Sequence, residues 1–365
     1  NEEGRTAGLP QGDDYEQFLR EHGLAAQAWA HGVGQNQCGV RPSPVPEWAT
    51  TTGWTADTAI RFLRRRDPAR PFLLYVSFDK PHTPCTPPQA HLDHYREAIF
   101  PAPARGDWLD AGVPGRTRML QHAHGFDPGQ WRAHEIQAWQ RAYAACFSHI
   151  DDRIGQILGT LREQQVLDNT WIVITADHGD QAFDHGSFAK GDFATGSCHI
   201  PLIVAPARRW SRWQAQRLGG SVRQVAPGLQ DVLPTLLDAA GIAAPAGLTG
   251  QSLVPFLADA APAFRAHTIG RCEWQYCISD GRYRLWWLAD DRRDLLFDLD
   301  ADPLCTRDLS ARDPATVARL RAALAQELAA RGDERVRDGR LRSDGLDHRL
   351  EQAHVRNLWN NRGWR

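Results

Sequence analysis

Lysine is nearly absent from this chain of 365 residues: of its 42 lysines and arginines, only Lys80 and Lys190 are lysines. The seven cysteines are scattered without a C-x-x-C pair, which indicates neither a zinc site nor a disulfide framework. No apolar run approaches the roughly 18 residues of a membrane span, so we expect no membrane-spanning segment. The formal net charge of −2 lacks the basic excess typical of a nucleic-acid-binding surface, so we expect no nucleic-acid partner.

Methionine is equally scarce, and its single occurrence is Met119, whereas the chain begins with Asn1. We therefore expect that the translation start, with any targeting segment, precedes Asn1, and the compartment stays open between cytoplasm and periplasm. The length favours one large domain with a smaller one. We predict an α/β catalytic domain over residues 1–258, a small α+β subdomain over 259–331 and an Arg-rich surface tail over 332–365.

Helices are predicted from apolar residues that recur every three or four positions. The strongest such pattern runs from His134 to Gln165 and predicts a long amphipathic helix. A second helix is expected to begin at a Thr55 cap and to end at Arg66, where cations suit the helix dipole. Further helices are expected over residues 14–22, 230–240 and 314–330.

Strands are predicted from short apolar runs. Phe72–Phe78 and Trp171–Ala176 are continuous runs with the pattern of strands buried on both faces, and Pro201–Ala205 is a third, shorter run. Such runs alternating with helices predict an α/β sandwich with a central, mainly parallel sheet and helices on both faces. Four short alternating segments, 267–273, 275–279, 283–288 and 295–299, predict a small C-terminal antiparallel sheet with the last helix packed on it.

Asp177 and His178 follow the second predicted strand and precede Gly179. Neighbouring residues on a strand point to opposite faces, so both side chains can serve one site only where the strand breaks into a turn, which the glycine permits. In open parallel α/β sheets, ligands bind beyond the carboxyl ends of the strands. A carboxylate oxygen and an imidazole nitrogen form part of a shell for a divalent cation. The alternative is an Asp-His pair that only closes a turn.

Both lysines lie beside histidines in loops that follow the apolar runs. His82 stands between Pro81 and Pro84, and an imidazole preorganised in this way suits proton donation to a leaving alkoxide. Lys190 follows the Asp177-His178 turn and could complete an anion pocket there. Lys80 precedes His82 and is a second candidate for anion binding. Solvated surface side chains are the alternative for each of them.

These residues stand in sequence patterns that follow one another in a particular order. The patterns are Lys80-Pro-His82-Thr-Pro84, Phe147-Ser-His-Ile-Asp151-Asp152-Arg-Ile-Gly155, Ile174-Thr-Ala-Asp177-His178-Gly179-Asp180, Asp184-His185-Gly186-Ser-Phe-Ala-Lys190-Gly191, Asp231-Val-Leu-Pro-Thr-Leu-Leu, Gly250-Gln-Ser-Leu-Val-Pro and Leu296-Phe-Asp-Leu-Asp-Ala-Asp302-Pro303. Together, over about residues 70–310, they closely resemble the sulfatases of the alkaline phosphatase superfamily. The resemblance implies an alkaline-phosphatase-like sandwich and hydrolysis of a small-molecule sulfate ester, and it leaves homo-oligomer formation open.

The resemblance also assigns roles. It makes Asp177 and His178 metal ligands, Lys190 a sulfate contact, and His82 a residue that binds sulfate or protonates the leaving oxygen; Lys80 is a further substrate-binding candidate. The metal expected is Ca²⁺, with Mn²⁺ as the alternative. The family nucleophile is a formylglycine made from a C/S-x-P-x-R sequence. No segment of this chain matches that sequence, since Cys85-Thr-Pro-Pro-Gln89 lacks the arginine. We therefore expect the nucleophile in a missing N-terminal segment and expect the chain as given to be inactive.

Departures from the family pattern leave two other functions open. Many sulfatases have Asp-Asn where this chain has Asp177-His178, and the histidine form also occurs in phosphonate monoester hydrolases. A phosphonate monoester or phosphodiester hydrolase is therefore one alternative. The unmatched nucleophile sequence, and His199 where family members often have arginine, make a catalytically inactive binding remnant the other.

Overall fold

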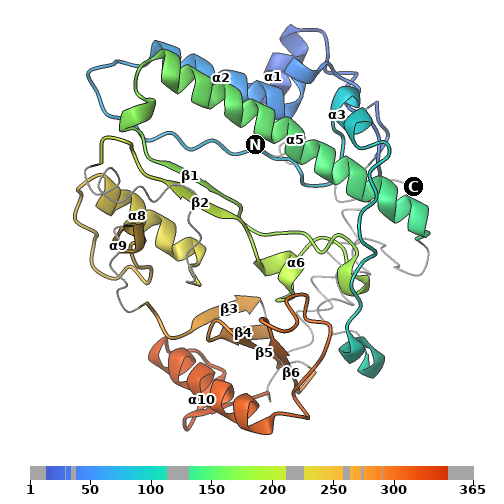
Figure 1. Ribbon diagram of the computed structural model, residues 1–365, viewed down its shortest axis with the longest axis vertical. Coiled ribbons are helices and arrows are strands. Elements are labelled where there is room, and N and C mark those ends of the chain that lie inside the picture. The colour runs from blue at the N-terminus through green and yellow to red at the C-terminus, as the bar shows by residue number, and fades with distance from the viewer. Residues whose placement is uncertain are drawn as a thin grey trace. The chain divides into compact units, whose positions relative to one another are not determined.

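The computed structural model describes residues 14–28, 30–33, 38–112, 131–210, 226–257, 264–272, 275–289 and 291–343 (Figure 1). The chain divides into two compact units. Unit 1 comprises residues 1–102 and 130–170, and unit 2 comprises residues 103–129 and 171–365. This division differs from the boundaries at 258 and 331, which remain predictions from sequence. None of the helices in the described ranges is long and apolar enough to cross a membrane.

Unit 1 is mainly helical. Its elements are α1 (Asp14–Glu21), η1 (Glu47–Ala49), α2 (Thr51–Arg65), α3 (Gln89–His94), α5 (Ala133–Glu163) and η4 (Leu167–Asn169). The predictions of α1 and of the long helix α5 are confirmed. The predicted start of α2 was wrong: the helix begins at Thr51 because the Thr50 hydroxyl accepts a hydrogen bond from the Gly53 amide at 3.0 Å. Such a cap contributes about 1 kcal/mol.

The core of unit 1 lies between α2 and α5, which run side by side (Figure 1). Ala56, Leu63 and Ile157 are among its buried residues. The segment Phe72–Phe78 packs against this core through alternate side chains, while Leu73 and Tyr75 on its other face are 78% and 87% exposed. The prediction of a strand buried on both faces was therefore wrong. Within the described residues the segment has no strand partner, and the core lies on only one of its faces.

The first part of unit 2 contains β1 (Ile172–Thr175) and β2 (Leu202–Ala205), which confirm the two predicted apolar runs. The strands pair antiparallel, with Ile172 opposite Ala205. The central sheet was expected to be mainly parallel, and within the described residues this antiparallel pair is the part of it that is observed. The alternation of apolar runs and helices in the sequence does not determine the direction of each strand. The other elements here are η2 (Asp107–Ala111), η5 (Asp184–Gly186), α6 (Thr195–Cys198), η6 (Leu229–Asp231), α8 (Val232–Ala239) and α9 (Val254–Leu257).

The predicted C-terminal antiparallel sheet is confirmed as a meander of four strands. These are β3 (Thr268–Cys272), β4 (Gln275–Ser279), β5 (Tyr283–Leu288) and β6 (Arg293–Asp298). Helix α10 (Pro314–Ala330) packs on the sheet, as expected, and buries Leu320, Leu324 and Leu328 against it (Figure 1). A hairpin of β7 (Val336–Arg337) and β8 (Arg340–Leu341) adds Val336 and Leu341 to this core. The first residues of the predicted tail therefore pack on this sheet and helix, and residues 344–365 lie outside the described residues.

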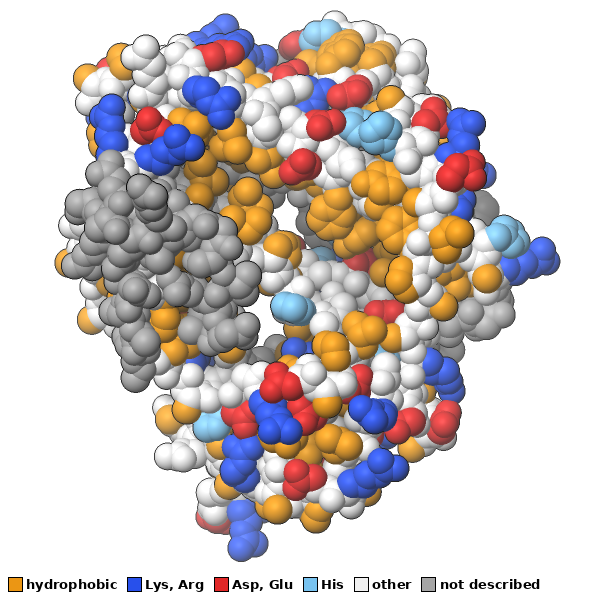
Figure 2. Space-filling model, viewed as in Figure 1, with side chains coloured by type: hydrophobic (Ala, Val, Ile, Leu, Met, Phe, Trp, Pro, Cys, Tyr) orange, Lys and Arg blue, Asp and Glu red, His pale blue; other side chains and the backbone are white. Residues whose placement is uncertain are grey.

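Charged side chains of both signs are interspersed on the face of the molecule shown in Figure 2. This distribution agrees with the small formal net charge of −2. Long-range attraction of a strongly charged partner needs a surface dominated by one sign of charge. The described part of this face offers a mixed surface instead.

Candidate functional site

Asp177 and His178 lie just beyond the end of β1, in unit 2. The Asp177 carboxylate accepts a hydrogen bond from the His178 amide at 2.9 Å, and its second oxygen lies 3.4 Å from His178 Nε2. His178 Nδ1 lies 2.8 Å from the Gly179 carbonyl oxygen. Because a carbonyl can only accept, Nδ1 is the donor in this contact, and Nε2 is the ring nitrogen that faces the carboxylate. The Asp177 carboxylate and the His178 ring therefore lie side by side at this turn.

Gly179 is needed here for close approach of two backbone segments. Its amide donates to the Ser197 carbonyl at 2.9 Å. A Cβ atom at this position would lie 2.0 Å from the Gly196 carbonyl oxygen, far inside any normal contact. The absence of a side chain thus lets the turn that carries Asp177 and His178 rest against the start of α6.

Lys190 lies next to this turn because the loop between Gln181 and Ala189 is closed by a backbone hydrogen bond. The Gln181 amide donates to the Ala189 carbonyl at 2.7 Å, which brings the two ends of the loop together. The Asp180 carboxylate accepts from the amides of Ala182 at 2.8 Å and Ala189 at 3.2 Å. Burial raises the pKa of Asp180 to about 7, although the nearby Lys190 ammonium opposes this rise. Asp180 and Lys190 are therefore close enough to interact electrostatically.

Two buried polar residues that were not predicted as site residues, His185 and Asp192, make hydrogen bonds that stabilise this loop. His185 is 3% exposed and its Nε2 lies 2.9 Å from the Leu304 carbonyl. Asp192 is buried and accepts hydrogen bonds from the Gln181 side chain and from the Ala194 amide. Burial raises the pKa of Asp192. The sequence signal for these residues was a histidine and an aspartate close to the buried Phe183 and Phe188. A charged side chain that is buried needs hydrogen-bond partners within the protein.

Lys80 and His82 lie in unit 1, in the proline-rich loop after the extended segment. The Lys80 side chain is 7% exposed, and its ammonium donates to the Pro84 carbonyl at 3.1 Å, with the Asp79 carboxylate at 3.4 Å. His82 Nδ1 lies 2.9 Å from the Thr83 carbonyl and is therefore its donor. The structure thus gives Lys80 partners in its own loop. Cys85, whose surrounding sequence lacks the arginine of the family nucleophile motif, is fully buried.

The five candidates therefore form two local groups. Asp177, His178 and Lys190 share one loop system in unit 2, whereas Lys80 and His82 share one loop in unit 1. The first group places a carboxylate oxygen and an imidazole nitrogen side by side, so its donors fit a divalent cation as part of a larger shell.

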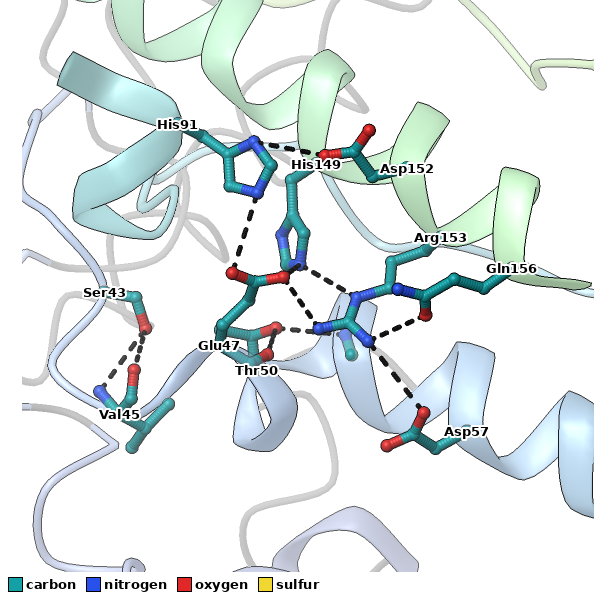
Figure 3. A network of polar contacts seen from close by, with 11 residues as sticks. Ser43, Val45, Glu47, Thr50, Asp57, His91, His149, Asp152, Arg153 and Gln156 are labelled. Carbon is teal, nitrogen blue, oxygen red and sulfur yellow. Dashed lines mark hydrogen bonds and ion pairs between the residues drawn. The ribbon is translucent and has the colours of Figure 1, made fainter. Parts of the chain in front are cut away.

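A third cluster, in unit 1, was not found from the sequence. Glu47 from η1, His91 from α3 and His149 from α5 point toward one another beside Arg153 (Figure 3). Burial lowers the pKa of His149 to about 4, and the neighbouring His91 and Arg153 add to this effect. The signal in the sequence was a histidine and an arginine on the apolar face of α5, where both are buried.

Comparison with known proteins identifies the class to which this fold and these residues belong. The phosphonate monoester hydrolase of Agrobacterium radiobacter has a similar structure, with a TM-score of 0.67 at 23% identity over 87% of this chain and 68% of that one. The solved structure of BT4656 with D-glucosamine-2-N,6-O-disulfate matches with a TM-score of 0.63 at 22% identity over 81% of this chain and 72% of that one. These likenesses confirm the alkaline-phosphatase-like fold.

The sequence comparisons give the family. A model of the Sulfatase family matches residues 3–242. An arylsulfatase of Clostridium perfringens is 30% identical over 311 residues, which are 83% of this chain and 63% of that protein. The multifunctional alkaline phosphatase superfamily protein PehA of Trinickia caryophylli is 27% identical over 61% of this chain and 44% of its own length. The chain belongs to the sulfatase family of the alkaline phosphatase superfamily, and it spans only part of these curated relatives.

Proposed function

We propose that this chain carries part of the active site of a metal-dependent hydrolase of sulfate esters. The observation that carries the proposal is the local geometry after β1. There, Asp177 Oδ2 and His178 Nε2 lie 3.4 Å apart, and the closed loop returns Lys190 to the same turn. Membership in the sulfatase family supports this reading.

Asp177 and His178 are proposed to hold a divalent cation, with Ca²⁺ as the first choice and Mn²⁺ as the alternative. A cation bound there would neutralise charge on sulfate oxygens. The Gly179 carbonyl, by accepting from Nδ1, keeps the His178 ring oriented with Nε2 as the donor atom. The nucleophile is expected from the family resemblance to be a formylglycine, which we do not assign to any residue of this chain.

Lys190 and His82 are proposed to act on the ester itself. The Lys190 ammonium would bind the oxygens that gain negative charge when the sulfur–oxygen bond breaks. His82 would give a proton from Nε2 to the departing alcohol oxygen. Its Nδ1 can donate to the Thr83 carbonyl whether the ring is neutral or protonated, so this contact leaves Nε2 available for proton donation. Lys80, with partners in its own loop, is proposed to keep that loop in shape.

One observation favours a second candidate function. The histidine at 178, where many sulfatases have asparagine, also fits hydrolysis of phosphonate monoesters or phosphodiesters. The relative PehA carries a name that describes it as multifunctional. The two reactions share the need for a cation, an anion-binding lysine and a proton donor, so the same residues would serve either one.

The test is a comparison of kcat/KM for an aryl sulfate and an aryl phosphonate monoester, made with the complete gene product. We expect the sulfate to be the better substrate and Lys190→Ala and His82→Ala to lower its turnover by about 10²-fold or more. Lys80→Ala should act mainly by lowering the melting temperature. Faster turnover of the phosphonate would favour the second function, and no turnover of either ester would support the inactive binding remnant.

A further inference from the structure

We infer that Glu47, His91 and His149 form a binding site for a transition-metal ion, with Zn²⁺ as the best match, in addition to the proposed catalytic metal site. Glu47 Oε2 lies 3.8 Å from His91 Nε2, and Glu47 Oε1 lies 3.7 Å from His149 Nε2. The donor atoms of the three residues all lie within 4.8 Å of one another (Figure 3). This is the one such cluster of three among the described residues.

The donor chemistry selects the metal. Two imidazoles and one carboxylate suit zinc, whereas calcium prefers six to eight oxygen ligands. Zinc–ligand bonds of about 2.0–2.2 Å place two tetrahedral donors about 3.4 Å apart. The two histidines face different oxygens of Glu47, at 3.8 Å and 3.7 Å, and one donor atom from each of the three residues gives a set that lies within 4.8 Å. Side-chain rotations would therefore have to draw the donors together by up to about 1.4 Å to reach the tetrahedral spacing. A water molecule or a small anion would take the fourth position.

Surrounding residues favour this use of His91 and His149. The Asp152 carboxylate lies 3.9 Å from His91 Nδ1, on the side of the ring opposite Glu47 (Figure 3). A carboxylate that accepts a hydrogen bond from Nδ1 orients a metal-binding histidine so that Nε2 faces the ion, and Asp152 stands on the side of the ring from which a small approach would form that bond. The two rings lie 4.8 Å apart between centroids, and the side chain of His149 is only 3% exposed. The rings are therefore held by packing and require little ordering on binding.

Arg153 is the competitor for this site. Its Nη2 donates to Glu47 Oε1 at 2.8 Å, and its Nε lies 3.4 Å from His149 Nε2. A metal ion would replace both contacts. The guanidinium has other partners to retain, because its Nη1 donates to Gln156 at 3.0 Å and lies 3.9 Å from the Asp57 carboxylate. Removal of the arginine charge should therefore strengthen metal binding, whereas it would weaken a cluster that is only an ion-pair network.

The experiment is zinc titration by calorimetry on the full chain, in an Asp177→Asn/His178→Gln background that removes the proposed catalytic ligands. We expect one zinc ion per chain, and we expect Glu47→Gln or His91→Ala to weaken the affinity by at least tenfold. Arg153→Gln should strengthen it. His94→Ala on α3 and His134→Ala on α5 are matched controls, because both histidines are exposed on the same helices, and they should leave the affinity unchanged.

Cobalt substitution identifies the donors independently. Co²⁺ at this site should show visible d–d absorption without the near-ultraviolet band of a thiolate ligand. A thiolate band would place the metal on cysteines and overturn the inference. So would the absence of saturable zinc binding below about 0.1 mM, or equal weakening by Arg153→Gln and His91→Ala. Because the background lacks Asp177 and His178 as ligands, these outcomes are separate from the fate of the proposed sulfatase function.

Discussion

Replacement of Gly179 by alanine tests whether the turn after β1 positions Asp177 and His178. The new Cβ would stand 2.0 Å from the Gly196 carbonyl oxygen and 3.1 Å from the Gly196 carbonyl carbon. Both are backbone atoms and cannot rotate away. The turn or the start of α6 must therefore move by about 1 Å, a displacement that costs about 10²-fold in rate when it affects reacting groups.

The expected result is a fall of about 10²-fold in kcat/KM for an aryl sulfate, which equals about 3 kcal/mol of transition-state stabilisation. Stability should fall as well, because the Gly179 amide loses its 2.9 Å hydrogen bond to Ser197, worth about 1 kcal/mol. The assay is steady-state hydrolysis by the complete gene product, with the melting temperature measured in parallel. Gly196→Ala should have a smaller effect, since its Cβ would lie 2.7 Å from the Gln181 side-chain oxygen and 3.0 Å from backbone atoms of Asp180 and Gln181, which are less severe contacts.

The matched control is Gly155→Ala on the exposed face of α5, where a Cβ would meet nothing within 4 Å. Alanine is favoured over glycine in a helix by about 1 kcal/mol, so this variant should be slightly more stable and equally active. Activity of Gly179→Ala within about threefold of the unmodified protein, an effect of only about 0.6 kcal/mol, would refute the reasoning. It would mean that the close approach at this turn does not position the two side chains.

Two further predictions concern buried carboxylates in unit 2. Asp231 is fully buried and ion-paired with Arg265, so Asp231→Ala should lower the free energy of unfolding by about 3–5 kcal/mol in urea titration. The exposed Asp238, changed in the same way, should cost about 1 kcal/mol, and equal costs would contradict this account. For Asp192, burial raises the pKa above the usual 3.8, so the folded state holds the proton more tightly than the unfolded state does. The free energy of unfolding therefore falls as pH rises from about 4 through the folded pKa of Asp192. The melting temperature of Asp192→Asn should fall less over this range than that of the unmodified protein. Equal falls for the two proteins between pH 4 and 8 would contradict this prediction.

The sequence alone determined the elements that local periodicity encodes. The apolar spacing within His134–Gln165 was sufficient to predict α5, and Pro314 and Ala330 were predicted as the ends of α10. The four short alternating segments predicted the C-terminal meander, and the position of Asp177-His178 after an apolar run predicted their place beyond β1. These features depend on neighbours within a few residues, which the sequence displays directly.

Only the tertiary structure decided features that depend on distant segments. Periodicity showed that Phe72–Phe78 is apolar, but packing covers one of its faces and leaves Tyr75 exposed. Likewise, the helical pattern places His149 on the buried side of α5, whereas its partners Glu47 and His91 come from separate segments. Burial follows from local pattern because it reflects the period of a helix or strand. The identity of a long-range partner depends on which segments pack together, and no local pattern records that choice.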